Sequence, residues 1–301
     1  MQSVSPTRIH AVPLPGIVRA RRSAALRIAL LCTPACFLLL VFFAVPLLGN
    51  AARSLGVDLH ATSSDAHALA NYERLFLDPY YRSIVWETLN VSFFTTVLCL
   101  LLGYPVAHFM VRRAGWLAMP MLFLLITPLL TSIIMRTFGW RVLFARHGLF
   151  NDVLMWMNLI EHPLKVLGGP LGVYIGLVHV MVPFMVLSII PVLRGVDRRL
   201  EESARTLGAG VIRTFLLVTL PLAAEGVATG CVLVFMLTSG SFVTQLMLGD
   251  GSVVTLPLLI FQQFSLTQDL GFASAMGNLL LAIVLICLYL QLRMSDRKGD
   301  A

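Results

Sequence analysis

The sequence predicts an all-α membrane protein with six transmembrane helices. Apolar residues make up 58% of its 301 positions and charged residues only 12%, which is outside the usual range of a soluble domain. Residues 28–49 form a run without a single charged side chain. At about 1.5 Å rise per residue, a helix of this length covers roughly the 30 Å of a bilayer core. This run is therefore predicted to be the first span.

The same criterion predicts five further spans. They cover residues 88–110, 116–135, 171–193, 222–248 and 273–292. The chain then divides into a basic leader at 1–27, a six-helix domain at 28–292 and a tail at 293–301. All five cysteines fall inside predicted spans, where a thiol behaves as a small hydrophobe, so they favour neither a disulfide framework nor a metal site.

The basic leader raises the alternative of a cleaved signal peptide. The apolar run that follows it is longer than the roughly 7–15 residues of a signal h-region. No clear small-x-small cleavage pattern comes after it. We therefore expect the first span to be retained as an anchor.

Loop charge predicts the orientation. If the N-terminus is cytoplasmic, the inside segments carry 15 of the 22 Lys and Arg residues, although the outside segments are longer in total. By the positive-inside rule, both termini lie in the cytoplasm of a multi-pass protein. Anionic lipid and this rule account for the net charge of +7, so no nucleic acid partner is expected.

An ion-driven secondary transporter or channel is the main alternative class. Such coupling usually needs carboxylates or paired ionisable groups in mid-membrane. Glu87 and Glu225 lie at predicted span ends, and the six predicted spans hold no Asp, Glu, Lys or Arg at mid-depth; His108 and His179 are expected to be structural. Serine-hydrolase, zinc-protease and P-loop motifs are also missing from the sequence. We expect a chain that is not an enzyme, with no catalytic residues and no bound metal or cofactor.

A charged segment, residues 197–221, separates the fourth and fifth predicted spans. Asp197 can cap a helix whose first turns hold Glu201 and Glu202, acids that suit the positive end of the helix dipole. Leu200, Ala204 and Leu207 follow at i, i+4 and i+7 and form an apolar stripe. The pattern predicts a short amphipathic helix.

A glycine bend is predicted to follow this helix. Gly208 can take the left-handed conformation that ends a helix, and a second helix then runs from Val211 towards Pro221. Pro221 is predicted to begin the fifth span, at a first-turn position where its missing N–H costs little. Two short helices joined in this way form a compact projection, although an ordinary solvated loop is the alternative.

The spacing in this segment resembles a family signature. Glu202-Ser203-Ala204, three residues, Gly208, nine residues and then Val218-Thr219-Leu220-Pro221 is similar to the E-A-A, x3, G, x9, I-x-L-P pattern of binding-protein-dependent ABC importer permeases. Ser203 and Val218 depart from it by small changes. The resemblance implies the transmembrane domain of a type I ABC importer, in which residues 197–221 form the coupling segment. The implied contact residues are Glu201, Glu202, Ser203, Ala204, Leu207, Gly208, Leu220 and Pro221.

Three further stretches resemble the spermidine/putrescine-type permeases of that family. They are MRTFGWRVLFARHGLFNDVL (135–154), GSFVTQLMLGDG (240–251) and IFQQFSLTQDLGFASAM (260–276). Ser241, Gln245 and Asp250 stand where members often carry an acid, a proline and a glycine, which leaves aminophosphonates and opines open as solutes beside polyamines. Within the outside segment 136–170, Phe150, Leu154 and Met157 also predict a short amphipathic helix against the outer face of the bundle.

The resemblance also implies the partners. They are a cytoplasmic ABC ATPase dimer that binds the ATP and Mg, a second homologous six-helix permease, a periplasmic substrate-binding protein and the lipid of a bacterial inner membrane. Because the spans hold no ion-coupling group, the energy for uptake is expected to enter through the coupling segment.

The fifth span carries six hydroxyl or amide side chains, from which we predict the solute pathway. Thr238, Ser241 and Gln245 are spaced i, i+3 and i+7, so one helix would place them on one face. Polar groups facing lipid are costly, so this face should meet water or protein. The alternative is that the hydroxyls bond back to their own helix carbonyls and the face packs against a neighbour.

Overall fold

A computed structural model describes residues 33, 34, 36–56 and 69–299 of the chain. The predicted basic leader and the start of the first span lie outside the described residues. The chain divides into two compact units, residues 1–52 and residues 53–301. In the first unit, a π-helical turn η1 (Leu40–Ala44) leads into α2 (Val45–Ser54), which ends in the second unit. The helix Cys36–Ser54 is long and apolar enough to cross a membrane and ends five residues later than predicted.

The second unit is described as a set of helices of very different length. They are α3 (Ala70–Leu77), α4 (Pro79–Arg112), η2 (Gly115–Leu117), α5 (Ala118–Leu130), α6 (Ile133–Leu143), α7 (Leu149–Trp156), α8 (Pro170–Gly195), α9 (Arg198–Thr206), α10 (Val211–Thr214), η3 (Phe215–Thr219), α11 (Leu220–Leu222), α12 (Ala224–Ser239), α13 (Val243–Leu248), α14 (Leu256–Gln262), η4 (Gln263–Thr267) and α15 (Leu270–Gly299).

Three of these helices confirm predicted spans. Helices α4, α8 and α15 each contain a stretch long and apolar enough to cross a membrane. Helix α4 begins nine residues earlier than predicted, at Pro79, because Asp78 caps it by accepting a hydrogen bond from the N–H of Tyr80 at 2.8 Å. Glu87 therefore lies in the third turn of a 34-residue helix, not at its start.

The third and fifth spans were each predicted as one helix, at 116–135 and 222–248, and both fall where two helices meet at a bend. The stretch Gly115–Leu130 turns through 99° into α6, and Val211–Leu222 turns through 72° into α12. At the first bend, the carbonyl oxygen of Pro128 accepts hydrogen bonds from Thr131 Oγ1 and from Arg136 Nη1. These donors satisfy a carbonyl left open by the helix end. The bend also brings Arg136 into the second half of the third span, which was predicted to end at residue 135.

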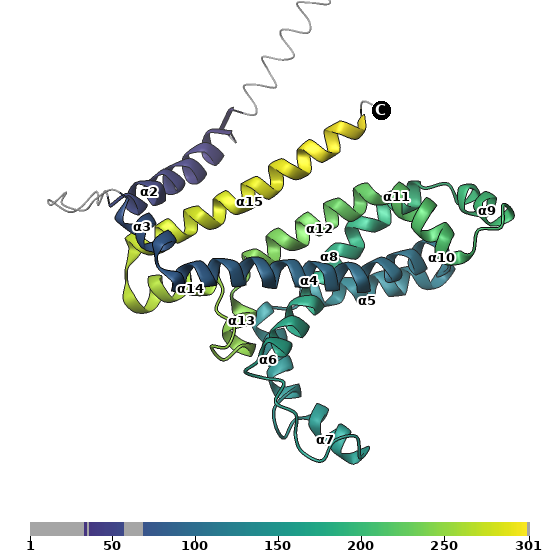
Figure 1. Ribbon diagram of the computed structural model, residues 1–301, viewed down its shortest axis with the longest axis horizontal. Coiled ribbons are helices and arrows are strands. Elements are labelled where there is room, and N and C mark those ends of the chain that lie inside the picture. The colour runs from purple at the N-terminus through teal and green to yellow at the C-terminus, as the bar shows by residue number, and fades with distance from the viewer. Residues whose placement is uncertain (1–32, 35, 57–68, 300–301) are drawn as a thin grey trace, which may run out of the picture. The chain divides into compact units, whose positions relative to one another are not determined.

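The core of the second unit lies where α4, α8 and α12 pack together (Figure 1). Helices α8 and α12 approach closely at two glycines of α12. A Cβ atom on Gly226 would lie 2.9 Å from Val192, and one on Gly230 would lie 2.8 Å from the sulfur of Met185. At Gly226 a larger side chain would force the helices apart, because Val192 Cβ and the carbonyl of Ser188 cannot move aside. At Gly230 the side chain of Met185 would have to shift.

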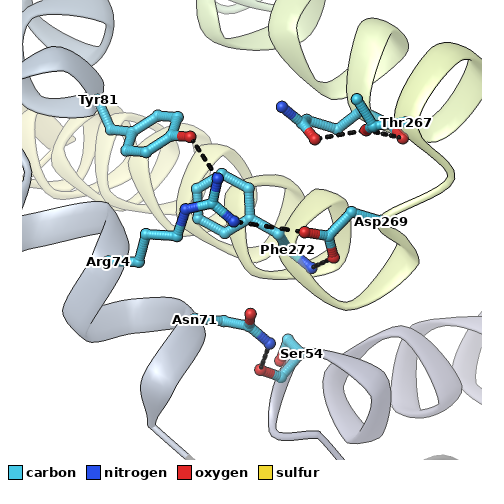
Figure 2. Close-up of polar contacts among 8 residues, drawn as sticks. Ser54, Asn71, Arg74, Tyr81, Thr267, Asp269 and Phe272 are labelled. Carbon is cyan, nitrogen blue, oxygen red and sulfur yellow. Dashed lines mark hydrogen bonds and ion pairs between the residues drawn. The ribbon is translucent and has the colours of Figure 1, made fainter.

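A polar cluster ties α3, α4 and α15 together (Figure 2). Arg74 donates from Nη2 to the hydroxyl of Tyr81 at 2.8 Å and pairs through Nη1 with Asp269 at 3.4 Å. Its guanidinium also lies 4.3 Å from the ring centroid of Phe272, which is fully buried. Asp269 in turn caps α15 by accepting from the N–H of Phe272. One arginine therefore joins the starts of α4 and α15.

The predicted amphipathic helix in 136–170 is present as α7, but its predicted packing is wrong. Phe150 and Met157 are exposed, and α7 lies beyond the end of α6, away from α4 and α8 (Figure 1). The segment is held instead by Asn151, which is fully buried. Its amide donates to the carbonyls of Ala145 and Leu164 and accepts from the N–H of Leu164 at 2.9 Å.

Candidate functional site

The first helix of the coupling segment, α9, begins as predicted. Asp197 has extended backbone angles and accepts a hydrogen bond from the N–H of Arg199 at 2.9 Å, as an N-cap does. The charged residues of α9 leave the helix polar apart from one stripe. In that stripe Leu200 and Leu207 are exposed and Ala204 is half-buried. The stripe therefore faces solvent over most of its length.

The glycine bend of the coupling segment is confirmed. Gly208 has a φ angle of +87°, in the left-handed region, and a Cβ built on it would meet no atom within 4 Å. The N–H of Gly208 donates to the carbonyl of Arg205, and the N–H of Ala209 donates to that of Ala204, both at 3.0 Å. These bonds close the last turn of α9 before Gly210 starts the second helix.

The prediction that Pro221 begins the fifth span is wrong. The second helix of the coupling segment continues through α10, the π-helical turn η3 and α11, and the 72° bend falls at Ala223. In η3 the N–H of Leu220 donates to the carbonyl of Phe215, one residue further back than in an α-helix. This wider turn just before Pro221 lets the helix pass the proline, which lacks an N–H.

Glu201 and Glu202 point in opposite directions. Glu201, predicted at the contact with a partner, is 6% exposed and faces inward, because Arg112 at the end of α4 binds its carboxylate. Glu202 is exposed and lies 3.5 Å from Arg198 one turn earlier. Ser203 is also exposed, so α9 presents Glu202, Ser203 and its apolar stripe outward and keeps Glu201 inside.

Leu220 and Pro221 lie apart from the glycine bend. Leu220 is half-buried and packs on the core cluster of α4 and α8, whereas Pro221 is exposed. The outer end of the segment carries further apolar side chains that sequence reasoning missed. These are Val211, Ile212, Leu216 and Leu217, which are all exposed. The signal for them is in the sequence, since five of the seven residues from 211 to 217 are apolar.

The predicted pathway face is not one helix face. Helix α12 ends at Ser239, and the chain passes through Gly240 before α13 starts at Val243. Ser239 Oγ bonds back to the carbonyl of Phe235 at 2.8 Å and to Ser92 Oγ at 2.9 Å, which holds the end of α12 against α4. Thr238, Ser241 and Gln245 therefore lie on two helices and the break between them.

Two of these residues are buried without a partner. Gln245 is fully buried and Thr238 nearly so, and neither Gln245 amide atom nor Thr238 Oγ1 has a hydrogen-bond partner among the described residues. Ser241 is half-buried. Buried polar groups are normally satisfied, so this region leaves open donors and acceptors inside the bundle.

A row of hydroxyls on α4 was missed in the second span. Thr88, Ser92 and Thr96 recur every four residues and each donates to the carbonyl one turn earlier. Thr88 Oγ1 also accepts from the N–H of Leu256 at 2.7 Å, at the start of α14. The four-residue repeat is visible in the sequence and explains why this face of α4 packs against protein.

A large apolar groove opens between α4, α5, α6 and α8, with a volume of about 750 Å³. Its polar side chains include Trp140, Tyr174 and His179. The indole N–H of Trp140 donates to Nδ1 of His179 at 3.3 Å. This bond fixes the imidazole between α6 and α8.

The fold defines a multi-pass membrane protein with a two-helix element between its fourth and fifth spans. The chain belongs to the family described as binding-protein-dependent transport system inner membrane component, whose model matches residues 25–299. It is therefore a transport permease of the cytoplasmic membrane, and the resemblance inferred from residues 202–221 is confirmed at the level of the family.

Individual relatives place the chain near the spermidine/putrescine permeases of this family. The spermidine/putrescine transport system permease protein PotB of Haemophilus influenzae is 33% identical over 235 residues, covering 77% of this chain and 82% of the relative. PotB of Escherichia coli is also 33% identical over 235 residues, covering 77% of this chain and 85% of the relative. A crystal structure of a bacterial ABC transporter involved in the import of the acidic polysaccharide alginate has a TM-score of 0.71 at 18% identity, covering 93% of this chain and 98% of that one. This similarity shows the fold, that of an ABC importer transmembrane domain.

Proposed function

We propose that this chain is the permease subunit of an ATP-driven importer that carries a polyamine of the spermidine/putrescine class. The observation that supports the solute most directly is the 33% identity to two PotB proteins over more than three quarters of the chain. Solute from a periplasmic binding protein would enter a pathway through the bundle. ATP and Mg would be bound by a separate cytoplasmic ATPase dimer, which drives alternating access.

The coupling segment is the proposed docking site of the ATPase. Its outer end combines exposed apolar side chains with the exposed carboxylate of Glu202, and its base packs on α4 and α8. A surface of this kind suits a protein partner. In this arrangement the segment and both termini lie in the cytoplasm. The open apolar groove between α4, α5, α6 and α8 supports a second six-helix permease as a further partner.

Uptake of labelled solute tests the proposed function. The chain is reconstituted in proteoliposomes with the ATPase, second permease and binding protein of the same transporter. We expect ATP-dependent uptake of spermidine or putrescine, and a rise in the melting temperature of the binding protein with the same polyamines. If that protein responds instead to an aminophosphonate or an opine, the permease assignment holds and the polyamine assignment fails.

Charge reversal at Glu202 tests the docking site. We expect the carboxylate of Glu202 to face a basic residue of the ATPase, so the new cation in Glu202→Lys should repel that residue and weaken ATPase retention about tenfold or more. The measurement is the amount of ATPase that co-purifies with tagged permease. Glu161→Lys, which reverses another exposed acid outside the coupling segment, is the matched control. Equal retention by both variants would favour an ordinary solvated loop.

Cysteine labelling tests Thr238, Ser241 and Gln245 as pathway residues, which we propose from the open donors and acceptors of Thr238 and Gln245 and from the position of Ser241 between them. Each is replaced by cysteine in a chain that lacks the five native cysteines. We expect labelling by a membrane-impermeant thiol reagent at Ser241→Cys. At the buried positions 238 and 245 we expect it only while ATP is being hydrolysed. Leu159→Cys is the exposed control. If that control labels and all three sites stay unreactive throughout the cycle, the pathway lies elsewhere.

A further inference from the structure

Arg112 joins three parts of the chain at the base of the coupling segment. It is the last residue of α4, where the helix dipole favours a cation. Its Nη2 and Nε atoms lie 2.9 Å and 3.0 Å from Oε1 of Glu201 in α9. Nη2 also donates to the carbonyl of Val196 at 3.0 Å, in the link between α8 and α9. A single guanidinium thus holds the end of α4, the link and the first helix of the coupling segment.

This ion pair is shielded from water. The side chains of Arg112 and Glu201 are only 10% and 8% exposed. Screening by salt and competition by water, which make surface ion pairs weak, therefore act little on it. Glu202, the next residue, makes only an exposed contact with Arg198. The two adjacent acids thus have different roles, one directed into the bundle and one away from it.

The ion pair is also the direct polar link between α9 and α4 among the described residues. The second helix of the coupling segment reaches α4 differently, through Phe215, whose ring centroid lies 5.0 Å from that of Tyr104 in an edge-to-face contact. An open pocket of about 540 Å³ adjoins these contacts, and Tyr104, His108, Glu201 and Phe215 are among its lining residues. Arg112 is therefore the side chain of α4 that binds α9 directly by hydrogen bonds among the described residues.

We propose that the Arg112–Glu201 pair is a positioning element that makes α9 and the end of α4 move together during transport. Movement of the coupling segment would then shift the second span directly, in addition to pulling on α8 and α12 through the chain. Without the pair, α9 could move with the ATPase while α4 stays in place. This inference rests on the proposed function, since it assumes that an ATPase moves the coupling segment.

The double variant Arg112→Gln/Glu201→Gln tests the proposal. A single substitution leaves a buried charge without its partner and can unfold the chain, whereas removing both charges is much less disruptive. We expect the double variant to assemble with the ATPase and hydrolyse ATP, but to transport about fivefold less solute per ATP. The readout is the ratio of uptake to hydrolysis in proteoliposomes, which lost stability alone would not change. A wild-type ratio in the double variant would overturn the proposal.

A distance measurement keeps the proposal testable if that variant does not assemble. Spin labels at the exposed positions Arg113 and Ser203 report the separation of α4 and α9 in a chain that retains the ion pair. We expect one distance in both the nucleotide-free and the ATP-trapped complex. A distance that changes between these states would overturn the proposal. The wild-type complex separates the two hypotheses: if it shows no ATP-dependent uptake, the proposed function itself fails.

Discussion

Replacing Gly208 with valine is expected to lower ATP-driven uptake at least about tenfold, because a left-handed residue with a β-branched side chain costs on the order of 1–3 kcal/mol. The φ angle of +87° at Gly208 ends α9 and sets the direction of the second helix. A valine would relieve its strain by leaving the left-handed region, which displaces the exposed side chains on either side of the bend relative to one another. Uptake and ATP hydrolysis in proteoliposomes measure the effect.

Gly210→Val is the matched control for this backbone effect. Gly210 is equally exposed, no atom lies within 4 Å of a Cβ built on it, and its φ of −65° and ψ of 165° suit any residue. We expect it to retain most of the uptake. Gly208→Asn should also retain more than Gly208→Val, since asparagine tolerates the left-handed region. Wild-type uptake by a Gly208→Val chain that reaches the membrane would contradict the assigned role of the bend.

The coupling segment could be predicted from sequence because its determinants are local. The cap from Asp197 spans two residues, and the left-handed turn at Gly208 depends on the absence of a Cβ. The helices α4, α8 and α15 were equally predictable, since long uncharged apolar runs leave few alternatives in a membrane.

The directions of Glu201 and Glu202 could not be predicted, because they depend on a distant residue. Arg112 lies 89 positions before Glu201 in the sequence. Nothing within α9 marks one acid as buried, and both suit the first turns of a helix. Glu201 is the buried acid only because α4 packs beside the α8–α9 link and brings Arg112 to it.

The breaks within two predicted spans depend on contacts that the hydrophobic pattern does not reveal. At the 99° turn after α5, Thr131 and Arg136 donate to the carbonyl of Pro128, which the helix end leaves open. At the break after Ser239, the side chain of Ser239 bonds to that of Ser92, which belongs to a helix far away in the sequence. Hydrophobic runs predict that these segments lie in the membrane. They do not predict where the helices bend or break.

The exposed leucine at the glycine bend bears most directly on partner binding. Leu207 is 89% exposed and Ile212, across the bend, is 75% exposed. Arg205 and Arg213 are exposed next to them, which places this end of the coupling segment outside the hydrocarbon of a bilayer. Apolar side chains of this size in such a setting indicate a surface that a protein partner covers.

Leu207→Asp is therefore expected to weaken ATPase binding by about 2–4 kcal/mol, or roughly 30- to 700-fold. The change removes the burial of a leucine and places an unpaired charge in the contact. Binding of the ATPase to permease in lipid nanodiscs measures the effect. Leu159→Asp, which makes the same change at a leucine that is 64% exposed but lies outside the coupling segment, should bind the ATPase like the unmodified chain. Both variants place the same new charge at an exposed leucine. A lower affinity of Leu207→Asp for the ATPase would therefore show that the ATPase contacts residue 207. Equal binding would mean that Leu207 faces water throughout the cycle and that the docking surface lies elsewhere.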